Sequence, residues 1–126
     1  MSQRASLTHD TIITTPIREE EVCPVARTAR IVSGKWTLLI IRDLTTGTKR
    51  FSTLERSLEG ISPKTLSERL SALEREGILS RRTFAEVPPR VEYSLTEKGQ
   101  ALVTLIGAMR EYGRRWLGCD DEAHEA

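Results

Sequence analysis

Cysteine is scarce in this chain, and its scarcity excludes one class of small protein. The sequence of 126 residues holds two cysteines, Cys23 and Cys119, whereas small secreted domains without a large core carry several disulfides. A lasting structural bridge between the two is not expected in a reducing cytosol. Reversible thiol chemistry remains open to both residues.

Histidine is equally rare and is absent from the central part of the sequence. The two histidines, His9 and His124, lie near the ends of the chain, so the central segment has no imidazole to act as a general base or a metal ligand. Two distant cysteines do not make a closed zinc site, and no glycine-rich phosphate loop is present. We therefore predict a protein that is not an enzyme and that uses no metal or cofactor.

Long apolar runs are also missing. The longest stretch made only of apolar residues is Leu38–Ile41, far short of the roughly 20 residues that a membrane-spanning helix needs. The polar N-terminus lacks the apolar core of a signal peptide. These features predict a cytoplasmic protein with no membrane partner.

Net charge is small over the whole chain, at +1, but the charges are unevenly distributed. Between Pro24 and Trp116 there are 17 Lys and Arg residues against 10 Asp and Glu residues, a net charge of +7. Acidic residues gather on either side of this segment, at Glu19–Glu21 and Asp120–Glu122. A basic segment of this kind suits a polyanionic partner such as nucleic acid.

The spacing of apolar residues predicts two short helices at the start of the basic segment. The first begins at Pro24, because proline is favoured at the first helical position, and stops at Gly34, which can adopt a left-handed conformation. The second spans residues 35–45 and ends before Gly47. It is expected to be mostly buried through a stripe formed by Trp36, Leu39, Ile40 and Leu44.

Two further helices form the pattern of a helix-turn-helix. Ser52 and Glu55 have the spacing of a capping box, which predicts the start of a third helix. After a turn at Gly60, Ser62 caps a fourth helix that ends at Gly77 and carries an apolar stripe of Leu66, Leu70 and Leu73. In such a pair the second helix enters the DNA major groove.

A β-hairpin is predicted to follow. Strand-like residues at 79–84 and 91–95 flank Val87-Pro88-Pro89, a segment that cannot continue the hydrogen bonding of either strand. A hairpin in this place is the wing of a winged-helix fold. Thr96 then caps a last helix, predicted from Glu97 to about Trp116, which is longer than one small domain needs.

With these elements in order, the sequence resembles the HxlR-type transcription regulators, a branch of winged-helix proteins related to the MarR family. The matching segments are Cys23-Pro24-Val25, Gly34-Lys35-Trp36, Lys49-Arg50-Phe51, Gly60-Ile61-Ser62, Leu73–Gly77, Val87–Thr96 and Gly99. The resemblance implies an α+β winged helix-turn-helix with additional N- and C-terminal dimerisation helices, bound to double-stranded operator DNA. It also implies that some members sense thiol-reactive compounds through the cysteine before the first helix.

The outward face of the fourth helix supplies the candidate base-reading residues. If its leucine stripe points inward, the helical geometry places four polar residues outside or on the flanks near the helix N-terminus: Lys64, Thr65, Ser67 and Glu68. Glu68 could accept a hydrogen bond from a cytosine amino group. The alternative interpretation is an ordinary solvated helix face.

Other basic and polar residues complete the predicted DNA-binding set. Arg82 and Arg90 of the hairpin are placed to reach phosphates, although charge on an exposed hairpin edge also serves to discourage strand association. Arg69 lies beside the apolar stripe, where it either reaches a phosphate or packs its stem against the protein. The set also includes Lys49, Arg50 and Ser62.

Cys23 is the one candidate reactive group. It directly precedes Pro24 at a predicted helix N-terminus, with Arg27 about one turn away, and both features favour a thiolate. The alternative is a small buried apolar residue. Cys119 follows the last helix and in a dimer could approach the partner subunit's Cys23, which would make both cysteines redox-sensing residues. A small-molecule or oxidant effector is the corresponding expectation.

The sequence as a whole predicts a homodimeric transcription regulator, more specifically a repressor that binds a palindromic operator. We expect an N-terminal arm over residues 1–21, the winged domain over 22–117 and an acidic tail over 118–126. The main alternative is a winged-helix module that binds protein without sequence-specific DNA binding, and a thiol-dependent enzyme is a more distant one.

Overall fold

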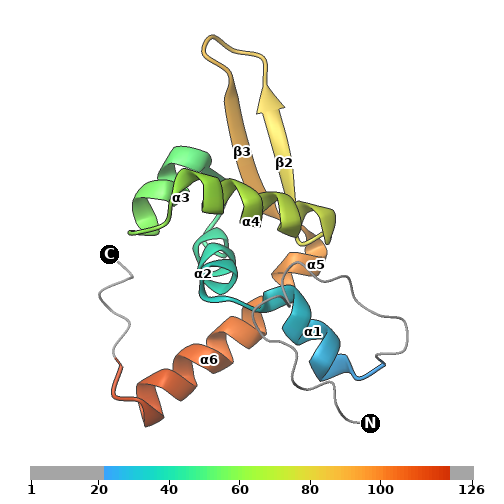
Figure 1. Ribbon diagram of the computed structural model, residues 1–126, viewed down its shortest axis with the longest axis vertical. Helices are drawn as coiled ribbons and strands as arrows, with labels where there is room; N and C mark the ends of the chain where they lie inside the picture. Colours follow the sequence, from blue (N-terminus) through green and yellow to red (C-terminus); the bar gives the residue numbers. More distant parts are fainter. Residues whose placement is uncertain (1–21, 120–126) are drawn as a thin grey trace.

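The computed structural model describes residues 22–119, so the predicted N-terminal arm and most of the predicted acidic tail lie outside the described residues. Helices dominate the fold, and a long hairpin projects from them (Figure 1). The elements in chain order are α1 (Pro24–Val32), α2 (Lys35–Leu44), β1 (Lys49–Arg50), α3 (Phe51–Ser57), α4 (Pro63–Arg75), β2 (Leu79–Phe84), β3 (Arg90–Leu95), α5 (Glu97–Gln100) and α6 (Val103–Trp116). Among these residues, none of the helices is both long and apolar enough to cross a membrane.

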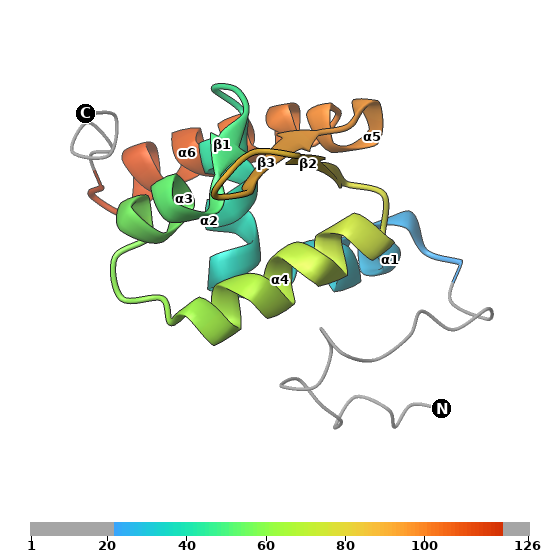
Figure 2. The same cartoon turned by 90° about the horizontal axis from the view of Figure 1, so that it is seen from above.

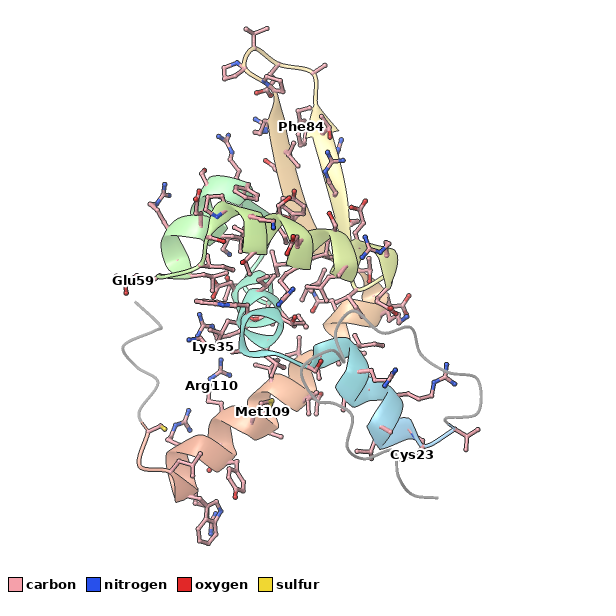
Figure 3. All side chains as sticks on the ribbon, in the orientation of Figure 1. Cys23, Lys35, Glu59, Phe84, Met109 and Arg110 are labelled. Atoms are coloured by element: carbon pink, nitrogen blue, oxygen red, sulfur yellow. The ribbon has the colours of Figure 1, made fainter. Side chains whose placement is uncertain are left out.

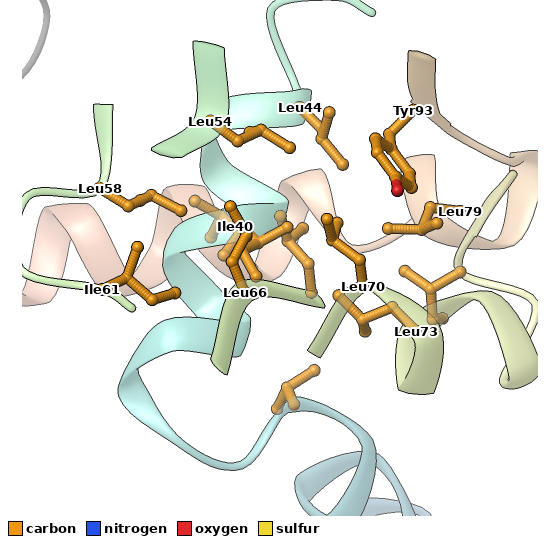
Figure 4. Close-up of a cluster of buried hydrophobic side chains, with 14 residues drawn as sticks. Ile40, Leu44, Leu54, Leu58, Ile61, Leu66, Leu70, Leu73, Leu79 and Tyr93 are labelled. Carbon is orange, nitrogen blue, oxygen red and sulfur yellow. The ribbon is translucent and has the colours of Figure 1, made fainter. Parts of the chain in front are cut away.

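The core lies where α2, α3, α4 and the sheet meet (Figure 4). Ile40, Ile41 and Leu44 of α2 are buried against side chains that include Leu54, Leu66, Leu70, Leu73, Leu79 and Tyr93. Burying one such side chain stabilises the fold by roughly 1.5–3 kcal/mol. The stripe predicted for α2 was partly wrong, since Ile41 belongs to the buried set whereas Trp36 and Leu39 are only partly buried against it.

The start of α4 agrees with its sequence and the start of α3 does not. Ser62 is the residue before α4, and its Oγ accepts a hydrogen bond from the Thr65 backbone N–H at 3.0 Å, as predicted. The predicted capping box of Ser52 and Glu55 is wrong: α3 begins at Phe51, with Arg50 as the preceding residue and no side-chain cap. Because β1 leads directly into α3, Ser52 is already inside the helix.

The hairpin belongs to a three-stranded antiparallel sheet with strand order β1-β3-β2. Strands β2 and β3 pair from Leu79 opposite Leu95 to Phe84 opposite Arg90. The short β1 pairs with β3, with Lys49 opposite Tyr93. This strand was not predicted, because two residues are too few to show alternation. The hairpin itself is the predicted wing, and the winged-helix fold is confirmed.

The single last helix that the sequence predicted is in fact two helices, α5 and α6, with a turn between them. Thr96 caps α5 as expected, by accepting from the Gly99 N–H at 3.1 Å. At the turn the Leu102 N–H donates to Gly99 O at 2.9 Å, which tightens the chain away from α-helical geometry. Gly99 also packs so closely that a Cβ there would clash with the backbone carbonyl of Ile78. Only glycine therefore fits at this position of α5.

Candidate DNA-binding surface

The turn between α3 and α4 is held firmly in place. Gly60 adopts a positive φ of 96°, which favours glycine. The next residue, Ile61, is buried in the core, and its N–H donates to Leu58 O at 3.0 Å. Ser62 then caps α4. The position and direction of α4 are therefore set by the core on one side and by the turn at its start.

The outward face of α4 is polar and accessible along its first two turns. The leucines of the inner stripe are buried, whereas Lys64, Ser67 and Glu68 are exposed. Lys64 Nζ lies 3.8 Å from Glu68 Oε2, an exposed pair of a kind that contributes about 0.3–0.5 kcal/mol or less. Such a pair gives way readily to a ligand. Viewed from above, α4 forms one edge of the molecule (Figure 2).

Thr65, Ser62 and Arg69 are more constrained than these residues. The Ser62 hydroxyl accepts from the Thr65 N–H and donates to Thr65 Oγ1 at 3.0 Å, so Thr65 is half-buried and its hydroxyl is oriented by the cap. Arg69 is also half-buried, and its buried Nε has no hydrogen-bond partner among the residues of the described chain. This half-buried position permits either alternative left open by the sequence.

The wing carries two arginines that differ in their surroundings. The Arg90 side chain is only 25 % exposed. Its Nη1 lies 3.0 Å from Glu86 Oε2, and its Nε lies 3.2 Å from Glu92 Oε2. Its guanidinium also stacks 4.0 Å from the centre of the Phe84 ring. Arg82 is exposed and packs over the same ring at 4.8 Å. Figure 3 shows Phe84 on the hairpin, well beyond α4.

The carboxylates beside Arg90 were not anticipated from the sequence. Glu92 follows Arg90 by two residues on β3, so the two side chains lie on the same face of the strand. The spacing of two residues within a predicted strand is the signal that could have found this pair. Glu86, in the loop of the hairpin, becomes a partner through the return of the chain at the tip.

Lys49 and Arg50 lie on β1, apart from both α4 and the hairpin tip. Lys49 is half-buried, and its Nζ donates to Thr46 Oγ1 at 2.7 Å. Arg50 is exposed at the start of α3. The structure thus distributes the predicted DNA-binding residues over three parts of the fold: helix α4 with its cap, the hairpin, and the β1–α3 junction.

Both cysteines are exposed and unpaired within the described chain. Cys23 is the residue preceding α1, as predicted, and Cys119 follows α6, where its Sγ donates weakly to Leu117 O at 3.7 Å. The start of α1 and the end of α6 lie on opposite sides of the molecule (Figures 1 and 2). A bridge between the two cysteines of one protomer is not compatible with this arrangement. Residues 22–119 contain no group of metal ligands.

The end of the molecule opposite the wing is unusually apolar. Val25 on α1 is 77 % exposed, and Trp116 on α6 is 66 % exposed. The other large exposed apolar residues on or beside these two helices are Val22, Val103, Met109, Tyr112 and Leu117. Large apolar side chains left exposed in this number on two helices are typical of a protein interface rather than of a free surface.

Comparison with known proteins gives a consistent result. Residues 31–121 match the family model described as HxlR-like helix-turn-helix. The chain is 39 % identical over 102 residues to the HTH-type transcriptional regulator YvaP of Bacillus subtilis, covering 80 % of this chain and 94 % of YvaP. These relatives are transcriptional regulators with a DNA-binding fold and not enzymes.

Solved structures agree with this assignment. A MarR-family transcriptional regulator from Porphyromonas gingivalis W83 is 39 % identical and superposes with a TM-score of 0.73, covering 81 % of this chain and 99 % of that one. The redox regulator HypR in its oxidised form is 38 % identical, with a TM-score of 0.70 and coverage of 73 % and 95 %. The chain therefore belongs to the HxlR-like helix-turn-helix family and is a transcriptional regulator of the helix-turn-helix type.

Proposed function

We propose that this regulator is a repressor that binds a palindromic operator as a homodimer. The observation that carries this proposal is the division of α4 into a buried leucine stripe and an exposed polar face beside an arginine-bearing hairpin. A helix held from behind in this way can enter the major groove without losing its place in the core. Occupying a promoter in this position would block transcription.

Within this proposal the residues have different roles. Lys64, Thr65, Ser67 and Glu68 read base edges from the N-terminal half of α4. Phosphate contacts come from the remaining set and fix the orientation of the protein: Lys49, Arg50, Ser62, Arg69, Arg82 and Arg90. Because Glu86 and Glu92 neutralise much of its charge, Arg90 contributes less to phosphate attraction than Arg82 and contributes more to the shape of the wing.

The homodimer would form through α1 and α6. Their exposed apolar residues lie at the end of the molecule opposite the wing (Figure 1), so a two-fold axis there leaves both recognition helices outward. Two α4 helices spaced by about 34–36 Å would meet successive turns of one DNA face. A palindromic operator follows from this symmetry.

Regulation by oxidation is the second part of the proposal. Cys23 precedes a helix N-terminus and is exposed, HypR is named as a redox regulator with oxidised and reduced forms, and both facts support a sensing role. An oxidant such as diamide would take two electrons and two protons from the thiols of Cys23 and the partner subunit's Cys119, forming a disulfide and a hydrazine. The bridge would shift α1 against the dimer interface and change the spacing of the recognition helices.

The cysteine proposal has a direct test. Wild type, Cys23→Ser and Cys119→Ser are treated with diamide, and operator affinity and mobility on non-reducing gels are measured. We expect the wild type to lose affinity and run as a cross-linked dimer, and Cys23→Ser to do neither. A full response of Cys23→Ser would remove Cys23 from the role, and a full response of Cys119→Ser would remove the bridge.

The DNA-binding proposal is tested by salt. Each phosphate contact releases a counterion. In a plot of the logarithm of the binding constant against the logarithm of the salt concentration, each such contact makes the slope more negative by nearly one unit. A steep slope on operator DNA is expected. A surface used for protein binding, the alternative, would show little affinity for DNA at any salt concentration.

A further inference from the structure

The C-terminal end of α4 is closed by a turn at Gly77, which adopts a positive φ of 79°. The Gly77 N–H donates to Glu74 O at 3.0 Å, and the Ile78 N–H donates to Leu73 O at 2.9 Å. This Schellman pattern provides partners for two of the last carbonyl groups of the helix. It provides none for Glu76 O, which needs a partner from outside the helix.

Lys98 of α5 supplies that partner from 22 residues further along the chain, where its Nζ donates to Glu76 O at 2.7 Å. Its side chain passes over the turn after α4, since a Cβ on Gly77 would lie 3.8 Å from Lys98 Cδ. The ammonium also lies at the negative end of the helix dipole, where positive charge is favourable. Lys98 is not among the residues proposed above to contact DNA, so that surface does not explain this contact.

Neighbours of Lys98 bind the next two carbonyl groups. The Thr96 hydroxyl donates to Gly77 O, and the Thr96 N–H donates to Ile78 O at 3.0 Å. Gly99 packs against the Ile78 carbonyl, in a place that no larger residue could occupy. Three consecutive carbonyl groups at the end of α4 are therefore bound by the start of α5. Figure 1 shows α5 between this end of α4 and α6, into which the chain continues.

We propose that Lys98 is a positioning residue for DNA binding, which holds the end of α4 on α5 so that the direction of α4 follows α6. In the proposed dimer the two-fold axis lies at α1 and α6, so the angle between α4 and α6 sets the distance between the two α4 helices. A firm junction restricts the dimer to one half-site spacing. Without Lys98, α4 tilts more freely and the dimer accepts other spacings. The effect on spacing rests on the proposed function, whereas the contact between Lys98 and α4 does not.

Operators that differ only in half-site spacing test this role. The full chain is titrated by fluorescence anisotropy against its selected operator and against versions with one base pair added or removed between the half-sites. Lys98→Met should bind the selected operator about three- to ten-fold more weakly, since a charge-assisted contact is lost, and should discriminate less between spacings. Lys98→Arg, which keeps a charged donor, should restore the preference of the wild type. An unchanged spacing preference in Lys98→Met would overturn the proposal.

Salt dependence separates positioning from direct contact with DNA. Lys98→Met should leave the logarithmic salt slope unchanged, whereas Arg82→Ala, at a proposed phosphate contact, should reduce it by about one unit. Lys35→Met removes the same charge from another exposed lysine, which lies at the start of α2, and should keep the spacing preference. A slope reduced by about one unit in Lys98→Met would show a phosphate contact instead. An equal loss of spacing preference in Lys35→Met would assign the effect to net charge. Either result would overturn the proposal.

Amide hydrogen exchange of the free protein tests the junction without DNA. Because Lys98 is exposed, Lys98→Met should fold as the wild type does by circular dichroism. Exchange at the Gly77 and Ile78 amides should become faster, because these hydrogen bonds open when the end of α4 is released, and exchange at Thr65 should not change. Unchanged exchange at both ends would show that Lys98 does not hold α4 and would overturn the proposal. A wild type that binds no DNA would refute the proposed function, and the exchange rates would still decide whether Lys98 holds α4.

Discussion

The two ends of this molecule treat their apolar residues in opposite ways. Around α2, α3, α4 and the sheet, the leucines and isoleucines are buried within one chain. On α1 and α6, large apolar residues such as Val25, Tyr112 and Trp116 remain exposed. The apolar residues of the first end are covered by the chain itself, whereas those of the second end resemble one side of a protein interface. In the proposed function, the first end contacts DNA and the second end self-associates.

The largest expected effect is on the free energy of unfolding, through the core around α4. Leu70→Ala removes a buried side chain of α4 and should lower the free energy of unfolding by about 2–5 kcal/mol, since a cavity replaces packed atoms. Ser67→Ala, an exposed change on the same helix, should change it by less than about 0.5 kcal/mol. Urea unfolding followed by circular dichroism measures both. Similar values for the two variants would mean that α4 is not anchored as described.

The next prediction concerns the proposed dimer interface on α6. Trp116→Asp places a charge on the exposed apolar face of α6 and should convert the dimer into monomers at micromolar concentration, because a buried unpaired charge is strongly unfavourable at an interface. Truncation after Gly107 should dissociate or unfold the protein. Analytical ultracentrifugation gives the mass.

A matched control lies on the wing. Val87 is fully exposed at the hairpin tip, so Val87→Asp makes the same kind of change far from α6 and should leave the dimer intact. A Trp116→Asp protein that sediments as the wild type would show that α6 is not the interface.

A smaller effect is expected at the base-reading face. Glu68→Ala should change base preference on an operator, with a loss on the order of 1–3 kcal/mol at the position that it reads. The Lys64–Glu68 pair is exposed, so the folded state should lose little stability. Fluorescence anisotropy on operators with single base changes measures the preference. An unchanged order of affinities would exclude Glu68 from readout.

The smallest effect distinguishes the two wing arginines. Arg82→Ala should weaken all DNA sequences alike and reduce the logarithmic salt slope by about one unit. Arg90→Ala should reduce the slope by less, because Glu86 and Glu92 already pair with Arg90. Titrations at several salt concentrations measure both slopes. A larger change for Arg90 would show that DNA displaces its carboxylate partners.

Local signals in the sequence were sufficient for α4 and the hairpin. Ser62, Pro63 and Gly77 mark the ends of α4, and the leucine spacing identifies its inner face. The same signals misplaced the start of α3, because Ser52 and Glu55 have a capping-box spacing while the strand pairing of Arg50 with Glu92 decides where the helix begins. A distant contact therefore overrode a local preference.

Other features depend on contacts that spacing does not reveal. The close approach of Gly99 to Ile78 depends on how α5 packs against the rest of the fold, and the Phe84 ring reaches Arg90 only through the alignment of β2 with β3. The apolar groove that Leu38 of α2 and Ile106 of α6 help to line likewise exists only once both helices are placed in space. For the predicted DNA-binding residues, the sequence could identify the outward face of α4 but not which of its polar groups would be held by their neighbours.

The central claim, that the outward face of α4 reads DNA as part of a symmetric dimer, is tested most directly by selection from a random DNA library. The purified full chain is expected to enrich one inverted repeat, with half-sites separated by about 10–10.5 base pairs from centre to centre. Sequencing of the retained fragments reveals the motif and its symmetry. A library that remains random after several rounds, or that enriches a single half-site without a repeat, would contradict the account.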